Sequence, residues 1–91
     1  MKQATVTIQN KVGLHARPAS LIMTVVNQYQ SAVRMEKPGK AADLGSIIDV
    51  LKLQGGHGDR ILITCEGEDE EACLAALTEL FENKFGEEQT I

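Results

Sequence analysis

The sequence predicts a small α+β domain in which helices cover one face of a β-sheet. Three segments alternate apolar and polar residues, as half-buried strands do, and two others repeat apolar residues at helical spacing, with a further short strand and short helix in the middle of the chain. These segments follow one another in the order β-α-β-β-α-β-α. A chain of 91 residues has room for one domain with one modest core, so the apolar faces of sheet and helices must meet.

The first part of the chain supplies two strands and the helix between them. Residues 2–9 predict the first strand, because Ala4, Val6 and Ile8 alternate with polar residues. A helix over about 16–28 follows, with apolar residues at helical spacing: Leu21, Ile22, Val25, Val26 and Tyr29. Val33 and Met35 then alternate with charged residues and predict the second strand.

The third strand and the second helix are both short. A Lys-Pro-Gly-Lys turn at 37–40 leads to a strand over 40–44, whose alanines are weak strand formers. Ser46 and Asp49 have the spacing of a capping box, which predicts a helix over about 47–53. Two glycines, at 55 and 56, end it.

The last two elements are a strand and a helix. Ile61, Ile63 and Cys65 alternate in the fourth strand, and the acidic run at 66–71 suits the start of a helix. That helix has an apolar stripe formed by Cys73, Leu74, Leu77, Leu80, Phe81 and Phe85. We expect one domain over 1–91, with a frayed tail after about residue 86.

Composition excludes several classes of protein. A net charge of −4 argues against nonspecific nucleic-acid binding, and no apolar run is long enough to insert into a membrane. The N-terminal residues alternate and lack the apolar region of a secretion signal. Cys65 and Cys73 have no metal-binding spacing, so we expect reduced core thiols in a cytoplasmic protein.

The string Gly-Leu-His-Ala-Arg-Pro-Ala-Ser at 13–20 points most directly to function. His15 stands just before a helix start, Arg17 follows, and Pro18 suits a first helical turn because its missing N–H needs no partner. A nucleophile, a cation and free backbone N–H groups thus meet at one helix N-terminus. This combination suits a phosphoryl group on the histidine.

The expected chemistry is phosphoryl transfer through His15, because a histidine at the N-cap position can aim its Nδ1 atom at the backbone N–H groups of the first turn. A neutral imidazole has a lone pair that can attack phosphorus. The backbone N–H groups of Ala16 and Arg17, with the Arg17 side chain, would then stabilise the phosphoryl oxygens. Gly13 would let the backbone turn close to the site, and Leu14 would pack beneath it.

These residues resemble the HPr family, the histidine-containing phosphocarriers of the bacterial phosphoenolpyruvate-dependent sugar phosphotransferase system. The match runs from Val6 to about Phe85, and a second family signature matches in part over 44–53. The resemblance implies an open-faced β-sandwich, with a four-stranded antiparallel sheet and three helices on one face. It also implies that His15 receives phosphate from enzyme I and passes it to enzyme IIA, assisted by Arg17.

The resemblance further implies that Ser46 is the position phosphorylated by an HPr kinase/phosphorylase in bacteria that have one. The residues around Ser46 weigh against such regulation here. Asp49 stands where the family usually has glycine and would repel a phosphate, and Gly45 replaces a common lysine. A helix cap worth about 1 kcal/mol explains Ser46 without a kinase.

Partner docking should use apolar residues near His15. We expect Ile47 to face solvent, with Leu21 and Leu51 on neighbouring turns, and basic residues at the rim. A domain that presents one small face to several partners is expected to be a monomer. It would act as a stoichiometric carrier rather than an enzyme, with no cofactor and no metal.

Two other functions stay open. A carrier of the nitrogen-related phosphotransferase branch would use the same His15 chemistry with different partners. A regulatory or ligand-binding α/β domain would use His15 only as a helix cap, and would tolerate its replacement by alanine.

Overall fold

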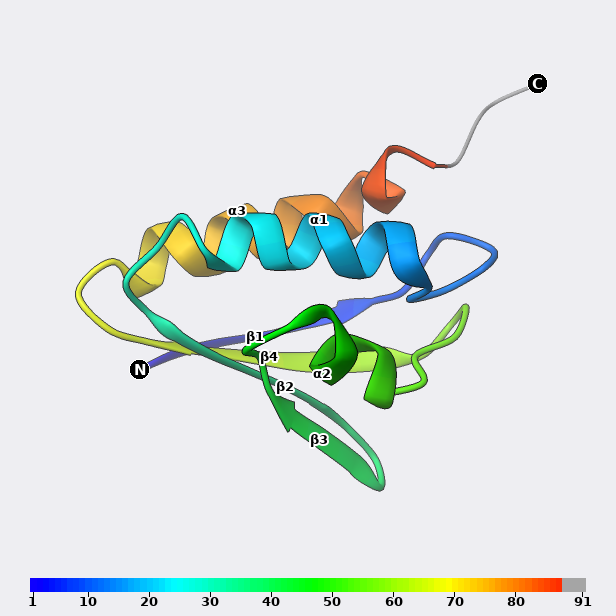
Figure 1. The fold of residues 1–91 in the computed structure, drawn as a ribbon, viewed down its shortest axis with the longest axis horizontal. Coiled ribbons are helices and arrows are strands. Elements are labelled where there is room, and N and C mark those ends of the chain that lie inside the picture. Colours follow the sequence, from blue (N-terminus) through cyan, green and yellow to red (C-terminus); the bar gives the residue numbers. More distant parts are fainter. Residues whose placement is uncertain (88–91) are drawn as a thin grey trace.

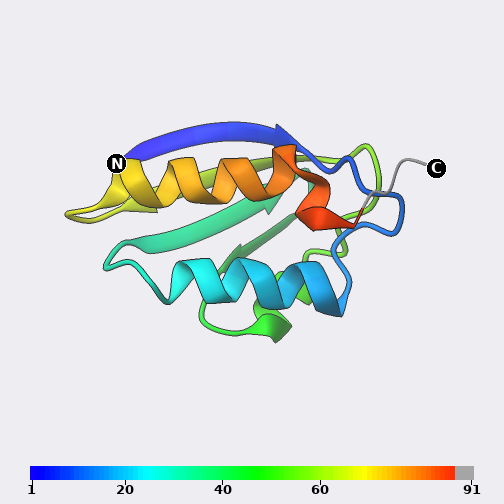
Figure 2. The same ribbon diagram turned by 90° about the horizontal axis from the view of Figure 1, so that it is seen from above.

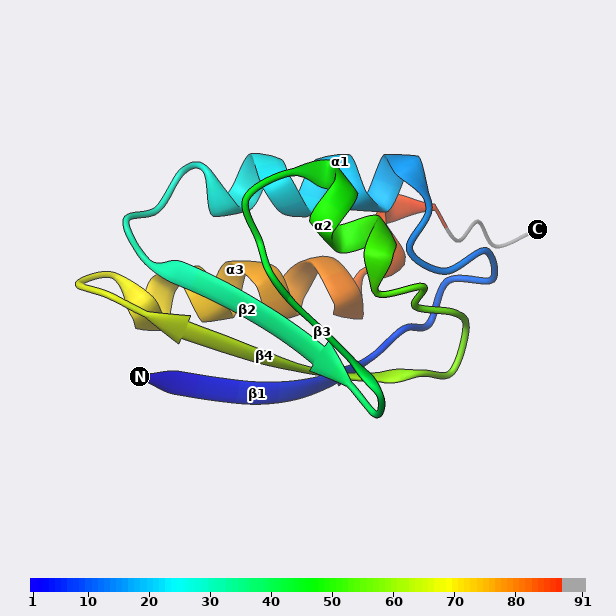
Figure 3. The same ribbon diagram turned by 60° about the horizontal axis from the view of Figure 1, so that its bottom comes forward.

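A four-stranded antiparallel sheet forms the base of the molecule. The computed structural model describes residues 1–87, and the strands lie in the order β1-β4-β2-β3. Their bounds are Lys2–Thr7 for β1, Ala32–Lys37 for β2, Lys40–Asp43 for β3 and Arg60–Glu66 for β4. Figure 3 shows the four strands side by side.

The two faces of the sheet differ as the alternating pattern predicted. Val6 lies opposite Ile61, and Met35 lies opposite Ile63, and all four side chains are buried on the helix side. The other face is polar, with a hydrogen bond from Gln3 to Thr64 at 3.1 Å. Polar side chains on the open face leave only one face for the core.

Helices α1 (Ala16–Val26) and α3 (Glu70–Glu82) cover the apolar face of the sheet. They run antiparallel to each other, as Figures 1 and 2 show. Ile22 from α1 and Leu77 and Phe81 from α3 have no exposed surface. Phe85 lies in a short 3-10 turn, η1 (Lys84–Gly86), and its ring packs edge-on against Phe81. These contacts close the core over the sheet.

The short helix α2 (Ile47–Lys52) packs against α1 and β3. Its predicted capping box is present, and the Asp49 carboxylate accepts a hydrogen bond from the Ser46 N–H at 2.9 Å. A hydrogen bond from the N–H of Gly45, and to a smaller extent this one from Ser46, hold the pKa of Asp49 below its ordinary value. Val50 is the fully buried residue of the helix.

The strands and helices described above confirm the predicted β-α-β-β-α-β-α order and open-faced sandwich.

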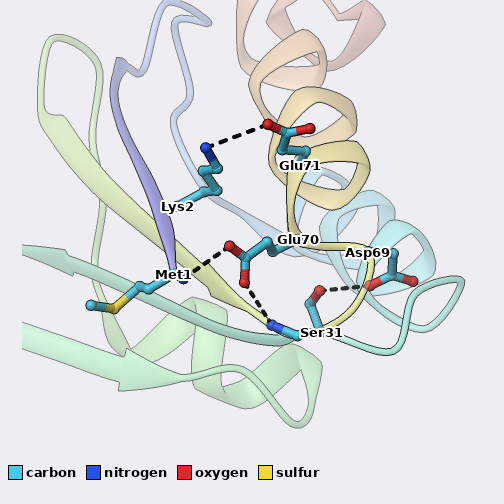
Figure 4. Close-up of polar contacts among 7 residues, drawn as sticks. Met1, Lys2, Ser31, Asp69, Glu70 and Glu71 are labelled. Atoms are coloured by element: carbon cyan, nitrogen blue, oxygen red, sulfur yellow. Dashed lines mark hydrogen bonds and ion pairs between the residues drawn. The ribbon is translucent and has the colours of Figure 1, made fainter.

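Polar contacts join the start of α3 to the N-terminus, just before β1, and to the turn that follows α1 (Figure 4). The carboxylate of Asp69 accepts hydrogen bonds from the hydroxyl of Ser31 at 2.6 Å and from the N–H of Gln30 at 2.8 Å. Glu70 pairs with the amino group of Met1 at 2.9 Å. The acidic run therefore positions α3, in addition to complementing its dipole.

The two cysteines are buried, free thiols, as predicted. Cys65 on β4 and Cys73 on α3 belong to the same core. Burial raises the pKa of Cys65 to about 12 and also raises that of Cys73. Both thiols are therefore unreactive at neutral pH, because the thiolate is the reactive form.

Several element boundaries differ from the predicted ones. The first strand ends at Thr7, because Ile8 exchanges backbone hydrogen bonds with the loop at 58–59 instead of with a strand. Helices predicted to reach 28 and 53 end at Val26 and Lys52, where turn hydrogen bonds replace helical ones. Glu87 is described and makes contacts, whereas the rest of the predicted frayed tail, 88–91, lies outside the described residues. Among residues 1–87, every helix is too short or too polar to cross a membrane.

Candidate functional site

The loop before α1 is held close to the loop that follows α2. Gly13 has a φ of +79°, and a Cβ there would lie 2.6 Å from the carbonyl oxygen of Gly55. The N–H of Leu14 donates to that same oxygen at 3.0 Å, and the Leu14 side chain is buried. Only glycine fits such a close approach with positive φ. The predicted roles of Gly13 and Leu14 are confirmed, and together they fix the backbone that leads into His15.

His15 is the N-cap residue of α1, as predicted, and its backbone is extended. Its carbonyl accepts a hydrogen bond from the N–H of Ala19 at 3.0 Å. Its side chain makes no hydrogen bond to the first-turn N–H groups, so the expected capping by Nδ1 is not found. Within residues 1–87, the N–H groups of Ala16 and Arg17 therefore have no hydrogen-bond partner. Unpaired N–H groups at a helix start favour an anion.

The imidazole of His15 instead contacts a residue from the end of the chain. Nε2 lies 2.7 Å from a carboxylate oxygen of Glu87, whereas the side chain as a whole is 39% exposed. The Nε2 edge is shielded from solvent, so the exposed part of the ring lies on its other atoms, which include Nδ1. Figure 2 shows the C-terminal turn η1 beside the start of α1.

Glu87 is the site residue that sequence reasoning missed. It follows the last helix and lies in the stretch predicted to fray, where no pattern distinguishes one glutamate from the next. Its second carboxylate oxygen accepts a hydrogen bond from Asn10, a buried residue of the loop before α1. Its role could be recognised only from the tertiary structure, because 77 residues separate Glu87 from Asn10 in the sequence.

Arg17 lies in the first turn of α1 and is exposed. It forms no ion pair with any residue of the described part of the chain, so its guanidinium can turn towards an incoming anion. A guanidinium offers a planar array of donors that matches phosphate oxygens.

The apolar residues predicted for docking are partly exposed. Ile47 is 39% exposed and Leu51 is 38% exposed, whereas Leu21 packs against the core and is only partly accessible. Ile48, which was not chosen from the sequence, is 63% exposed and is the most exposed residue of this set. Together, Ile47, Ile48 and Leu51 form an apolar patch on α2.

Ser46 is exposed at the start of α2, and a carboxylate already occupies that helix start. Asp49 accepts hydrogen bonds from the N–H groups of Gly45 and Ser46, both at 2.9 Å, and lies 3.4 Å from the Ser46 hydroxyl. A phosphate on Ser46 would meet this negative charge at the place where it needs donors.

Comparison with known proteins agrees with this geometry. The family described as "PTS HPr component phosphorylation site" matches residues 2–83. The chain is 40% identical over 88 residues to the phosphocarrier protein HPr of Pseudomonas aeruginosa, covering 96% of this chain and 98% of that protein. It is 35% identical over 88 residues to the HPr of Xylella fastidiosa, covering 97% and 99% of the two chains.

Solved structures show the same likeness. The crystal structure of HPr-C-His from Thermoanaerobacter tengcongensis superimposes with a TM-score of 0.91 at 40% identity, covering 98% of this chain and all of that one. A crystal structure of an HPr dimer from the same organism matches with a TM-score of 0.75, also at 40% identity, over 96% and 100% of the two chains. Sequence, fold and helix-start geometry agree, and the chain belongs to the HPr family of phosphocarrier proteins of the phosphotransferase system.

Proposed function

We propose that this phosphocarrier serves the sugar branch of the phosphotransferase system, accepting a phosphoryl group on Nδ1 of His15 from phosphorylated enzyme I. It would then pass that group to an enzyme IIA domain. The observation that carries the proposal is the position of His15, which is 39% exposed at a helix start whose first N–H groups have no partner among residues 1–87. A carrier needs one reactive atom that two partners can reach in turn.

The transfer needs charge stabilisation more than proton transfer. The phosphoryl transition state spreads negative charge over its equatorial oxygens. The N–H groups of Ala16 and Arg17, the positive end of the α1 dipole and the Arg17 guanidinium all favour that charge. Since the same groups face the phosphoryl group in both directions, they support acceptance and donation alike.

The apolar patch on α2 supplies a docking surface of a suitable kind. Transient interfaces combine an apolar centre with a polar rim. Ile47, Ile48 and Leu51 would form the centre, and exposed Arg17 and Lys52 would lie at the rim for acidic partners. Leu21 is more enclosed than expected and would contribute less.

We further propose that the protein acts in the cytoplasm as a monomeric, stoichiometric carrier. The nitrogen-related branch is the alternative pathway, since its carrier would use the same His15 chemistry. At Ser46, the Asp49 carboxylate favours a capping role over regulation. Incubation with ATP and an HPr kinase/phosphorylase should accordingly leave little acid-stable phosphate on Ser46.

Intact-mass spectrometry tests the proposal. The protein is incubated with phosphoenolpyruvate, magnesium and enzyme I from either branch. We expect one acid-labile phosphoryl group with the sugar-branch enzyme, lost in His15→Ala and retained in His57→Ala, which changes an exposed loop histidine. Labelling only by the nitrogen-branch enzyme would move the protein to that branch, and labelling of His15→Ala would overturn the assignment.

A further inference from the structure

The contact between Glu87 and His15 has a defined geometry on both sides. Oε2 of Glu87 lies 2.7 Å from Nε2 of His15, a close ion-pair contact whose angle does not suit a hydrogen bond, and Nε2 is shielded from solvent. Oε1 of Glu87 accepts a hydrogen bond from the side-chain amide of Asn10 at 2.9 Å. The carboxylate therefore bridges the loop before α1 and the imidazole ring.

Asn10 determines which way this bridge is oriented. Its side chain is 1% exposed, and its amide nitrogen also donates to the carbonyl oxygen of Gly13 at 2.8 Å. A flipped amide would place its oxygen against two acceptors, so the nitrogen must face Glu87 and Gly13. One oxygen of Glu87 is thereby held by Asn10, and the other is directed at His15.

We infer that Glu87 is a positioning residue that makes Nδ1 the nucleophilic atom of His15. A carboxylate oxygen 2.7 Å away repels a lone pair on Nε2, so the neutral ring keeps its proton on Nε2 and its lone pair on Nδ1. The partner of one ring nitrogen fixes the tautomer of the other in this way at many histidine sites. The inference deepens the proposed function and rests on it for its consequence in phosphoryl transfer.

The phosphoryl step balances with Glu87 in this role. The Nδ1 lone pair forms a bond to phosphorus while the donor's bond to phosphorus breaks, and the donor atom keeps that electron pair. Because Nε2 retains its proton, the ring of the product carries one positive charge. The Glu87 carboxylate faces that charge and stabilises it, as a carboxylate stabilises the imidazolium of a catalytic triad.

Nitrogen NMR of the His15 ring in the unphosphorylated protein tests the tautomer without any partner enzyme. We expect protonated Nε2 and unprotonated Nδ1 in the neutral ring of the wild type. In Glu87→Gln, Asn10 should hold the amide oxygen, which turns the amide N–H groups towards Nε2 and shifts the proton to Nδ1. In Glu87→Ala, the ring should show the mixture of tautomers found in water.

Phosphorylation kinetics test the consequence. We expect Glu87→Gln to lower the rate constant of phosphoryl acceptance by about tenfold, a size typical of residues that orient a reactive histidine. Glu87→Ala should be affected less, since water allows the reactive tautomer. Glu82→Gln removes the same charge from an exposed position of α3 and is the matched control, with an unchanged rate expected. Amide-proton spectra establish that each variant is folded.

The outcomes separate this inference from the proposed function. A proton on Nε2 in both wild type and Glu87→Gln, or equal rates in all variants, would overturn the role of Glu87. If the wild type accepts no phosphate from either enzyme I, the proposed function fails while the NMR result still decides the tautomer. A larger loss in Glu87→Ala than in Glu87→Gln would indicate a packing role and would also overturn the inference.

Discussion

The backbone at Gly13 passes so close to Gly55 that a Cβ on Gly13 would lie 2.6 Å from the Gly55 carbonyl oxygen. This contact fixes the position of the loop that ends at His15 relative to the loop after α2, since the N–H of Leu14 donates to the same Gly55 carbonyl. His15 is therefore positioned by the loop after α2 as well as by its own helix.

Gly13→Ala should accordingly weaken both fold and activity. The new methyl group forces the two loops apart and strains a positive φ, at a cost of about 1–3 kcal/mol. Urea unfolding should show that loss of stability, and phosphoryl acceptance should slow because His15 moves. Gly39→Ala is the matched control, because that glycine also has positive φ but has open space around it. Loss of stability in Gly39→Ala alone would contradict the role assigned to the close contact.

Arg17→Glu should slow phosphoryl transfer both to and from the protein. The exposed guanidinium has no ion pair among residues 1–87, so its removal should leave the unfolding midpoint nearly unchanged. The replacement places a negative charge beside the phosphoryl oxygens. Rapid-quench measurements in both directions would check this.

Lys2→Glu is the control for Arg17→Glu, since it makes the same change of charge at the first residue of β1. The N-terminus, where β1 begins, lies at the opposite end of the molecule from the start of α1 (Figure 1). Equal slowing in the two variants would show that net charge, and not the position of Arg17, controls the rate.

Two neighbouring positions of α2 should separate docking from stability. Ile48 is 63% exposed, so Ile48→Ala should weaken binding to enzyme I with a stability change within about 0.5 kcal/mol. Val50 is fully buried, so Val50→Ala should lower stability by about 1–3 kcal/mol through the cavity it leaves. Calorimetric titration and urea unfolding of both variants would check this division. Unchanged binding by Ile48→Ala would remove the patch from the docking surface.

Acid should destabilise the protein through carboxylates at the helix starts. The hydrogen bond from the Ser31 hydroxyl, followed by that from the N–H of Gln30, holds the pKa of Asp69 below its ordinary value of 3.8. Because the folded pKa is the lower one, this stabilisation is present above pH 3.8 and is lost as the pH falls through the folded pKa.

Asp69→Asn should therefore lower stability near neutral pH and reduce the further loss below about pH 4. Unfolding followed at a series of pH values would check this, with Glu68→Gln as an exposed control. If the free energy of unfolding fell with pH in the same way for wild type and Asp69→Asn, Asp69 would not contribute to acid sensitivity.

Local sequence patterns determined the order of elements, the buried faces of the strands and of the two longer helices, and the position of His15. A strand's period of two and a helix's apolar stripe are local properties, and so is the capping box of Ser46 and Asp49. The Gly-Leu-His-Ala-Arg-Pro string likewise placed a nucleophile and a cation at a helix start, because all its parts lie within one turn of chain.

Tertiary structure alone decided what touches the histidine and what faces solvent. Glu87 reaches His15 only because α3 returns the chain to the start of α1, and no local pattern encodes a contact across 72 residues. Ile48 is more exposed than Ile47 because the packing of α2 against α1 and β3 selects the buried face of this six-residue helix. The sequence determined which chemistry is present, and the packing of the helices determined which atom of His15 is left open.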